Sequence, residues 1–479
     1  MMRTIKYLII IVVLFISGCA VGPDYQRPDT EKPGKFGYLD SLKISDSTAF
    51  STTDTTWWAL FNDTTLNGLI KSALKENTDI NIAAARVEEF MGRYGVAKSD
   101  FYPKVGYDLS ANHGQFSAIN TGRENNPVTD QFVLTLNAAW EMDIWGKIRR
   151  TTESAQADLF ASEESRKGVV LLITTQLANS YVDLLTLKKQ LDIAVSTTQL
   201  RESALILFRL RYDKGDVSEL EIAQLESDYW YTKSQIPYLE KNIAQLENTI
   251  SVLVGRNPGL VKSPNTLDNL VLPNVPEGIP SQVLDRRPDI KQAENNLISA
   301  NAKIGAIKSL YYPSINLSGA LGLASNDLSV LFEPYSVLWN LGAGIVGPLF
   351  RGGEISGQVR VAESVKKQLL YSYIQTVRNA FKEVENALIE RTKVQEQLVY
   401  QQKRVKSLED YYRLSEMRYN EGVTSYLEVL DAQRSLFSAQ LDLAVVQANL
   451  YKSVVNIYSA LAGSWVDKAS MESVQPSEE

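Results

Sequence analysis

The sequence is a tandem duplication, and this feature constrains the fold more than any other. Six residues of the first half recur 210 residues later, and six more recur at an offset of 207. The first set repeats Asp79, Gly95, Lys98, Ser99, Tyr102 and Pro103 as Asp289, Gly305, Lys308, Ser309, Tyr312 and Pro313. The second repeats Arg211, Tyr212, Gly215, Ser218, Leu220 and Glu221 as Arg418, Tyr419, Gly422, Ser425, Leu427 and Glu428. Because the offset hardly changes, we expect two copies with the same order of elements.

The duplication and the segments that flank it predict six parts along the chain. A signal peptide (1–18) and an acylated N-terminal segment (19–65) precede the first repeat (66–255). A linker with six prolines (256–288) separates it from the second repeat (289–463), and prolines favour extended backbone there. The last segment, 464–479, is a polar tail that we expect to fray.

Each repeat is predicted to contain one helix, two strands and two long helices. The first helices are expected at 66–99 and 289–309, each ended by a nearby proline. Residues 146–213 and 354–421 contain no proline over 68 residues each, which is enough for helices of about 100 Å. Their apolar residues recur at spacings of three and four, so we expect helices packed side by side, as a coiled coil or a helical bundle.

Four segments alternate apolar and polar residues with a period of two: 105–112, 132–143, 315–323 and 337–345. Segments of this kind are typical of transmembrane β-barrels, although a half-buried soluble sheet shows the same alternation. In the membrane interpretation four strands are too few, because the smallest closed barrels have about 8 and open edges are not tolerated in lipid. Three copies of the chain would supply twelve strands.

The N-terminus favours the membrane interpretation. Arg3 and Lys6 precede an apolar run at 7–16, which is too short for a spanning helix and typical of a signal peptide. The run ends in Ile16-Ser17-Gly18-Cys19, which resembles the bacterial lipobox and implies cleavage before Cys19 and its acylation. The alternative is an ordinary signal peptide with an incidental cysteine. By resemblance to the sorting rules of enteric bacteria, Ala20 favours the outer membrane.

Composition excludes several classes of function. The net charge is −7, whereas a nucleic-acid binder would present a basic face. The chain has 1 His and 1 Cys, which leaves too few ligands for a zinc site and almost no material for a Ser-His-Asp or Cys-His centre. We therefore expect no metal, no cofactor other than the covalent lipid on Cys19, and no enzymatic activity.

Three blocks of sequence carry a family resemblance. Val21-Gly22-Pro23-Asp24-Tyr25 follows the cysteine, and Trp57-Trp58-Ala59-Leu60-Phe61-Asn62-Asp63 comes next. Tyr419-Asn420-Glu421-Gly422 precedes Leu427-Glu428-Val429-Leu430-Asp431-Ala432-Gln433-Arg434. Together with the duplication, these blocks resemble the outer membrane factor family, the TolC-like ducts, and in particular its lipoprotein branch, which is associated with multidrug-type tripartite efflux systems.

The resemblance implies a fold class, a function and partners. The fold is a mixed α/β membrane protein: a trimeric 12-stranded outer-membrane β-barrel, with four strands per chain, continued by a long periplasmic α-helical barrel. The function is that of an exit duct that passively conducts small molecules. The partners are two further copies of the chain, a periplasmic adaptor, an inner-membrane pump of the resistance-nodulation-division type, and outer membrane lipid.

Two alternatives are kept. One is the outlet of a type I protein-secretion system, which the acylated start disfavours without excluding it. The other is an acylated coiled-coil lipoprotein with a structural role, which would not need four alternating strands.

The candidate periplasmic gate is Leu427, Glu428, Asp431 and Arg434. Glu428 and Asp431 are three residues apart and share a helix face, so three copies could form a ring of carboxylates, which selects cations. Arg434 is expected to pair with one of these carboxylates, within the chain or in a neighbouring copy. By resemblance, Asp431 and Arg434 lie at the charged closure and Leu427 at an apolar constriction. The alternative is a set of solvated helix-end charges of little energetic value.

Overall fold

The computed structural model describes residues 20–29, 56–115, 128–273, 286–462 and 465–472. They form two compact units, each described here by itself. The first comprises residues 20–29, 87–162 and 292–373, and the second comprises the other described residues. The predicted signal peptide and Cys19 lie outside the described residues.

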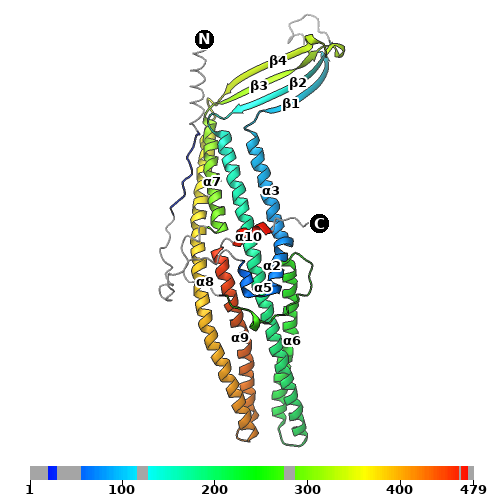
Figure 1. The fold of residues 1–479 in the computed structure, drawn as a ribbon, viewed down its shortest axis with the longest axis vertical. Coiled ribbons are helices and arrows are strands. Elements are labelled where there is room, and N and C mark those ends of the chain that lie inside the picture. The colour runs from blue at the N-terminus through cyan, green and yellow to red at the C-terminus, as the bar shows by residue number, and fades with distance from the viewer. Residues whose placement is uncertain (1–19, 30–55, 116–127, 274–285, 463–464, 473–479) are drawn as a thin grey trace. The chain divides into compact units, whose positions relative to one another are not determined.

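The first unit contains one antiparallel sheet of four strands (Figure 1). The strands are β1 (Lys104–Gln115), β2 (Val128–Met142), β3 (Ser314–Ser325) and β4 (Val337–Val346). Their spatial order is β1-β2-β3-β4, so each repeat contributes one pair and the two pairs join through β2 and β3. In the described part of the chain, β1 and β4 are therefore the free edges of the sheet.

The strand register gathers apolar side chains in a row across one face. Tyr107 lies opposite Leu136, Leu136 opposite Leu321, and Leu321 opposite Trp339. All four side chains are exposed, Tyr107 by 80% and Trp339 by 71%. A soluble sheet would cover such a row with its own core. Within the described residues nothing covers it, so the structure favours the barrel interpretation over the half-buried soluble sheet.

The helices agree with the proline-free stretches of the sequence. The two longest are α5 (Lys147–Asp213) and α8 (Glu354–Asn420), of 67 residues each. Each is followed by a turn and a second helix, α6 (Glu219–Leu253) and α9 (Tyr426–Leu461). Among the described helices, α5 alone has an 18-residue window apolar enough to cross a membrane, and half of that window is buried inside the structure. Burial on that scale is typical of a core helix.

The expected helix at 66–99 is two helices, so this prediction is wrong in one respect. α2 (Thr64–Glu76) ends before Asn77, and α3 (Thr78–Ser99) begins directly after it. The Asn77 side chain accepts hydrogen bonds from the backbone amides of Asp79 and Ile80, as an N-cap residue does. It also donates to the Leu253 carbonyl at 2.8 Å, which ties this break to the end of α6. In the second repeat, α7 (Pro288–Lys308) runs unbroken.

The core of the second unit contains a cluster of aromatic side chains around Trp57 and Trp58. Trp57 stacks on Tyr458 and meets Trp58 and Trp465 edge to face, with ring centroids 5.7–6.0 Å apart. Trp465 belongs to α10 (Trp465–Glu472), where the sequence analysis expects a frayed polar tail. That prediction is wrong for 465–472, because Trp465 is buried against this cluster.

Short 3-10 helices complete the described elements. The first, η3, holds the N-terminal tryptophan block, and η4 lies in the described part of the linker, where Val261, Leu267 and Leu270 join the core. The 3-10 helices are η3 (Trp57–Phe61), η4 (Leu267–Asn269), η6 (Ser309–Tyr311), η7 (Leu328–Val330) and η8 (Pro334–Ser336).

The residues that follow the acylation motif are bound to helices of both repeats in the first unit. The Asn301 side chain of α7 donates to the Pro23 carbonyl at 2.8 Å, and the Tyr25 hydroxyl donates to Glu294 at 3.2 Å. Arg150 of α5 donates to Asp24 at 2.6 Å. Residues 20–29 are thus held along the helices, and the chain just after Cys19 has a fixed course.

Candidate functional site

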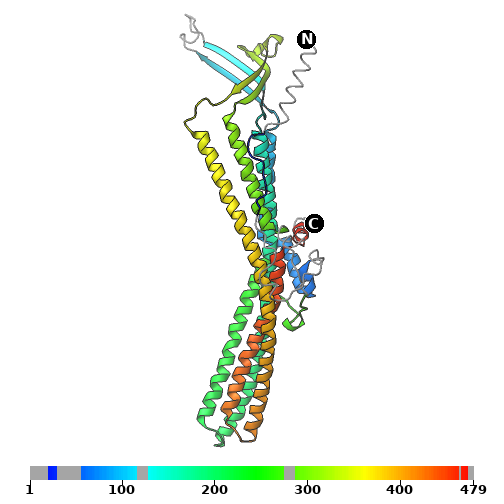
Figure 2. The same cartoon turned by 90° about the vertical axis from the view of Figure 1, so that its left-hand side faces the viewer.

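The two helix-to-helix turns, 214–218 and 421–425, lie at the same end of the second unit (Figures 1 and 2). Each contains a glycine with positive φ, Gly215 at 82° and Gly422 at 74°, a conformation that other residues adopt at a cost. A shared aromatic cluster joins the turns: Tyr426 lies 4.3 Å from Phe208 and 5.0 Å from Tyr419 between ring centroids. Burial raises the pKa of Tyr426 to about 12, so its hydroxyl stays neutral.

The corresponding glutamates of the two repeats have different partners. In the first repeat Glu221 forms a capping box with Ser218, which satisfies the start of α6. In the second repeat Glu428 accepts from Arg418 at 3.0 Å and from the Thr424 hydroxyl, and it makes no capping box. The duplication is therefore broken at the tip, and the acidic ring expected at Glu428 is partly neutralised within each chain.

Arg434 pairs with a residue that the sequence analysis did not single out. Its Nε donates to both carboxylate oxygens of Asp228 on α6, at 2.8 and 2.9 Å. Asp431 instead accepts from the Tyr411 hydroxyl at 3.3 Å. Within one chain, therefore, Arg434 pairs with Asp228 rather than with Glu428 or Asp431. We call Asp228–Arg434 the cross-hairpin pair, because it joins the α5–α6 hairpin to the α8–α9 hairpin.

The predicted apolar constriction residue is exposed. Leu427 is 51% exposed, whereas its neighbours Val429 and Leu430 are 1% exposed and pack in the aromatic cluster. Leu427 and Asp431 therefore lie on the exposed face of α9, while Leu430 packs into the aromatic cluster.

Three charged residues near the tip were not assigned to the candidate site from sequence: Arg201, Asp228 and Arg418. Arg418 was identified only as a repeated residue, without a role at the tip. At the offset of 207, Arg201 corresponds to Leu408 and Asp228 to Ser435. A charge in one copy opposite an uncharged residue in the other is the signal that marks both as departures from the repeat.

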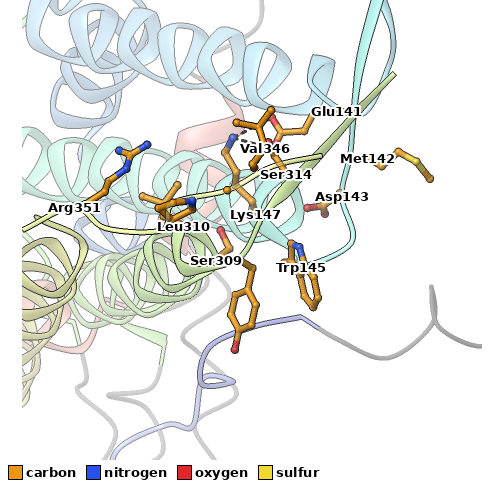
Figure 3. A pocket seen from close by; sticks show the side chains of 13 residues that line it. Glu141, Met142, Asp143, Trp145, Lys147, Ser309, Leu310, Ser314, Val346 and Arg351 are labelled. Carbon is orange, nitrogen blue, oxygen red and sulfur yellow. Dashed lines mark hydrogen bonds and ion pairs between the residues drawn. The ribbon is translucent and has the colours of Figure 1, made fainter. Parts of the chain in front are cut away.

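A polar cavity of about 210 Å³ lies in the first unit, where the ends of β2, β3 and β4 meet the helices (Figure 3). Lys147 donates to both carboxylate oxygens of Glu141 at 3.0 Å, and both residues line it. Trp145 stacks on Tyr312 at 4.7 Å and donates its ring N–H to the Pro313 carbonyl. Aromatic and cationic side chains beside strand ends are typical of the membrane–water interface.

The described residues contain no group of three or more His, Cys, Asp or Glu that could hold a metal ion. What the tip offers is a set of ion pairs and an aromatic cluster between two hairpins. Such an arrangement can hold helices together or release them, and it can select ions by charge.

Comparison with known proteins defines the class. Residues 69–256 and 279–463 match the family model "Outer membrane efflux protein", which covers both repeats. The chain therefore belongs to the outer membrane efflux protein family.

Individual relatives match the sequence over nearly the whole chain. The cation efflux system protein CusC of Escherichia coli is 32% identical, over 97% of this chain and 100% of its own. The probable outer membrane lipoprotein SilC of Salmonella typhimurium is 31% identical, with the same coverage. The toluene efflux pump outer membrane protein TtgC of Pseudomonas putida is 30% identical, over 98% and 97%. A crystal structure of CusC superposes with a TM-score of 0.83 at 30% identity, over 93% of this chain and 100% of that chain.

These findings confirm the predictions of fold class, function and compartment. The chain has the fold of the TolC-like outer membrane channels, with a four-stranded sheet and long helices. It is an outer-membrane exit duct of an efflux system. The duplicated helices and strands are thus those of a channel subunit.

Proposed function

We propose that three copies of the chain assemble into one duct, whose barrel is made of twelve strands. The observation that carries this proposal is the sheet itself: four strands, two free edges and an exposed apolar row. Unpaired strand edges in lipid cost several kcal/mol per polar group. Pairing β4 of one copy with β1 of the next removes both edges and turns the apolar row towards lipid.

We further propose that the helical tip is the periplasmic closure of this duct. Exposed Leu427 and Asp431 line the narrowing, and three copies contribute three Asp431 carboxylates to it. The cross-hairpin pair holds each chain's two hairpins together, so its release would let the α8–α9 hairpin move. Ordinary solvated charges would explain Asp431 but not the nearly buried Asp228 carboxylate, which is 8% exposed.

Lipid anchoring at Cys19 and the periplasmic partners belong to the same proposal. The motif before Cys19 and the likeness to a protein named a lipoprotein support acylation there. The duct works without catalysis or a cofactor, and an adaptor and an inner-membrane pump of the resistance-nodulation-division type supply cargo and opening. CusC is named for cations and TtgC for toluene, and the chain is almost equally similar to both. We therefore infer that the pump selects the cargo.

Conductance in a planar bilayer tests the closure. The purified protein should conduct poorly at rest and prefer cations, because carboxylates line the narrowing. Asp431→Asn should reduce that preference, since three charges are removed from the ring. Glu226, a partly exposed acid on α6, serves as the matched control, because Glu226→Gln removes three charges away from the proposed ring. Equal selectivity in the two variants would contradict the assignment of Asp431 to the ring.

A further inference from the structure

Arg201 is a buried cation that is not part of the proposed closure. Its side chain projects from α5 and the residue is 3% exposed. Its Nη1 donates to the backbone carbonyl of Asp228 at 2.7 Å, and its guanidinium lies over the Phe437 ring at 5.6 Å. The Nε and Nη2 atoms are buried and have no hydrogen-bond partner among the described residues.

The two free donors of Arg201 lie on the same edge of the guanidinium. The Nε–H and one Nη2–H bond are nearly parallel, and this edge matches two oxygen atoms carried by one central atom. A buried donor without a partner destabilises the folded state, and more so when it is charged. Native structures seldom leave such an edge empty, so the arrangement points to a ligand with two acceptor oxygens.

The local charge balance also calls for an anion. The nearly buried carboxylate of Asp228 is already bonded by Arg434, whereas Arg201 donates to the backbone carbonyl of Asp228 and not to its carboxylate. Burial lowers the pKa of Arg201, and the nearby positive charge of Arg434 lowers it further, against the attraction of Asp228. One added negative charge would balance the two positive charges of Arg201 and Arg434 together with the Asp228 carboxylate.

A cavity beside Arg201 offers room for that charge. It has a volume of about 110 Å³ and lies between α5, α8 and α9. Besides Arg201, its polar lining residues are Thr197, Tyr412, Gln433 and Gln440, and Phe437 forms part of its wall. A water molecule occupies about 30 Å³ in the liquid, so a small carboxylate fits.

We propose that this cavity binds a small oxyanion, a carboxylate or an inorganic oxyanion, held at both oxygens by Nε and Nη2 of Arg201. The site is separate from the closure at Asp431 and Leu427. The bound anion balances Arg201, so the Asp228 carboxylate stays with Arg434, and binding strengthens the cross-hairpin pair. The same edge could take a free anion or a carboxylate of a neighbouring copy, and the experiment separates these two sources.

The test compares acetate with chloride on the purified assembly in detergent, at equal sodium concentration. Replacing about 100 mM chloride by acetate should raise the apparent midpoint of thermal unfolding by at least ~1 °C, because a ligand that binds only the folded state stabilises it. Arg201→Lys keeps the positive charge but loses the paired donors, and the acetate shift should disappear. The matched control is Arg209→Lys, an exposed arginine on the same helix paired with Glu226, which should keep the full shift.

Three results would overturn the proposal. The first is an equal midpoint in acetate and chloride for the unmodified protein, which is also expected if a neighbouring copy's carboxylate fills the edge. The second is an acetate shift that survives Arg201→Lys. The third covers the case in which that variant does not assemble: in crystals of the unmodified protein soaked in selenate, the anomalous selenium peak should lie beside Nε and Nη2 of Arg201. Its absence there would refute the site.

Discussion

Replacing Asp228 by asparagine should loosen the closed tip. The change keeps the size of the side chain and removes the charge that binds Arg434 across the two hairpins. The aromatic cluster of Phe208, Tyr419 and Tyr426 is left intact. The variant should therefore fold and assemble, while the contact between α6 and α9 weakens.

The size of the effect follows from the exposure of the two partners. A hydrogen bond to a charged group contributes about 1.5–3 kcal/mol when desolvated, and much less when exposed. The Asp228 side chain is 8% exposed but that of Arg434 is 46% exposed, so solvent screens part of the interaction. We expect a loss of about 1–2 kcal/mol per chain, which shifts the balance between the open and closed forms of each chain by a factor of about 5–30.

The assay is the single-channel open probability in a planar bilayer. The control is Glu226→Gln. Glu226 lies on the same helix as Asp228, but it pairs with Arg209 inside one hairpin and its side chain is more exposed than that of Asp228. It should change the open probability by less than a factor of about 5, as expected for exposed pairs. The double variant Asp228→Asn with Arg434→Gln should open little more than either single variant, because both remove the same interaction.

Two results would refute this reasoning. If Asp228→Asn and Glu226→Gln leave the duct equally closed, the cross-hairpin pair does not contribute to closure. If the effects of Asp228→Asn and Arg434→Gln simply add, the two residues act independently, and the closure has to be sought at exposed Leu427.

Three further predictions concern the anchor, the turn and the core. Cys19→Ser should abolish labelling with radioactive palmitate, whereas unchanged labelling would exclude the lipobox. Gly422→Ala should lower stability by about 1 kcal/mol, measured as a lower midpoint of thermal unfolding, because φ is 74° there; an unchanged midpoint would show that the turn relaxes. Trp465→Ala should cost about 3–5 kcal/mol by the same measurement, since the side chain is fully buried. A cost near zero would mean that α10 does not belong to the core.

The elements with a long, regular period could be predicted from sequence. The apolar alternation of the strands survives in the structure as the row from Tyr107 to Trp339, because the period of two is a property of extended backbone. The two helices of 67 residues coincide with the stretches without proline. Both signals are local and extend over many residues.

Short elements and local breaks could not be predicted in the same way. Asn77 ends one helix and begins the next through its side-chain cap, but asparagine within a helix is common enough to be overlooked. α10 has only eight residues, and its order comes from the contact of Trp465 with Trp57 and Trp58. That contact joins residues about 400 positions apart, so the tail looks merely polar when considered alone.

The candidate site was only partly predictable for the same reason. The spacing of Glu428, Asp431 and Arg434 places them along one helix face, but it does not select their partners. Each partner lies on another element: Asp228 on α6 for Arg434, and Tyr411 on α8 for Asp431. Pairing across elements depends on how the hairpins pack, which no periodicity encodes.

The mass of the purified protein in mild detergent tests the central claim, that three copies share one barrel. Native mass spectrometry should give a particle of three chains, each close to 53.5 kDa apart from the loss of the signal peptide and the gain of lipid. The strand edges at β1 and β4 are then paired between copies. A stable monomer that stays in solution without detergent would contradict the account, because four strands with free edges and an exposed apolar row cannot cross a membrane alone.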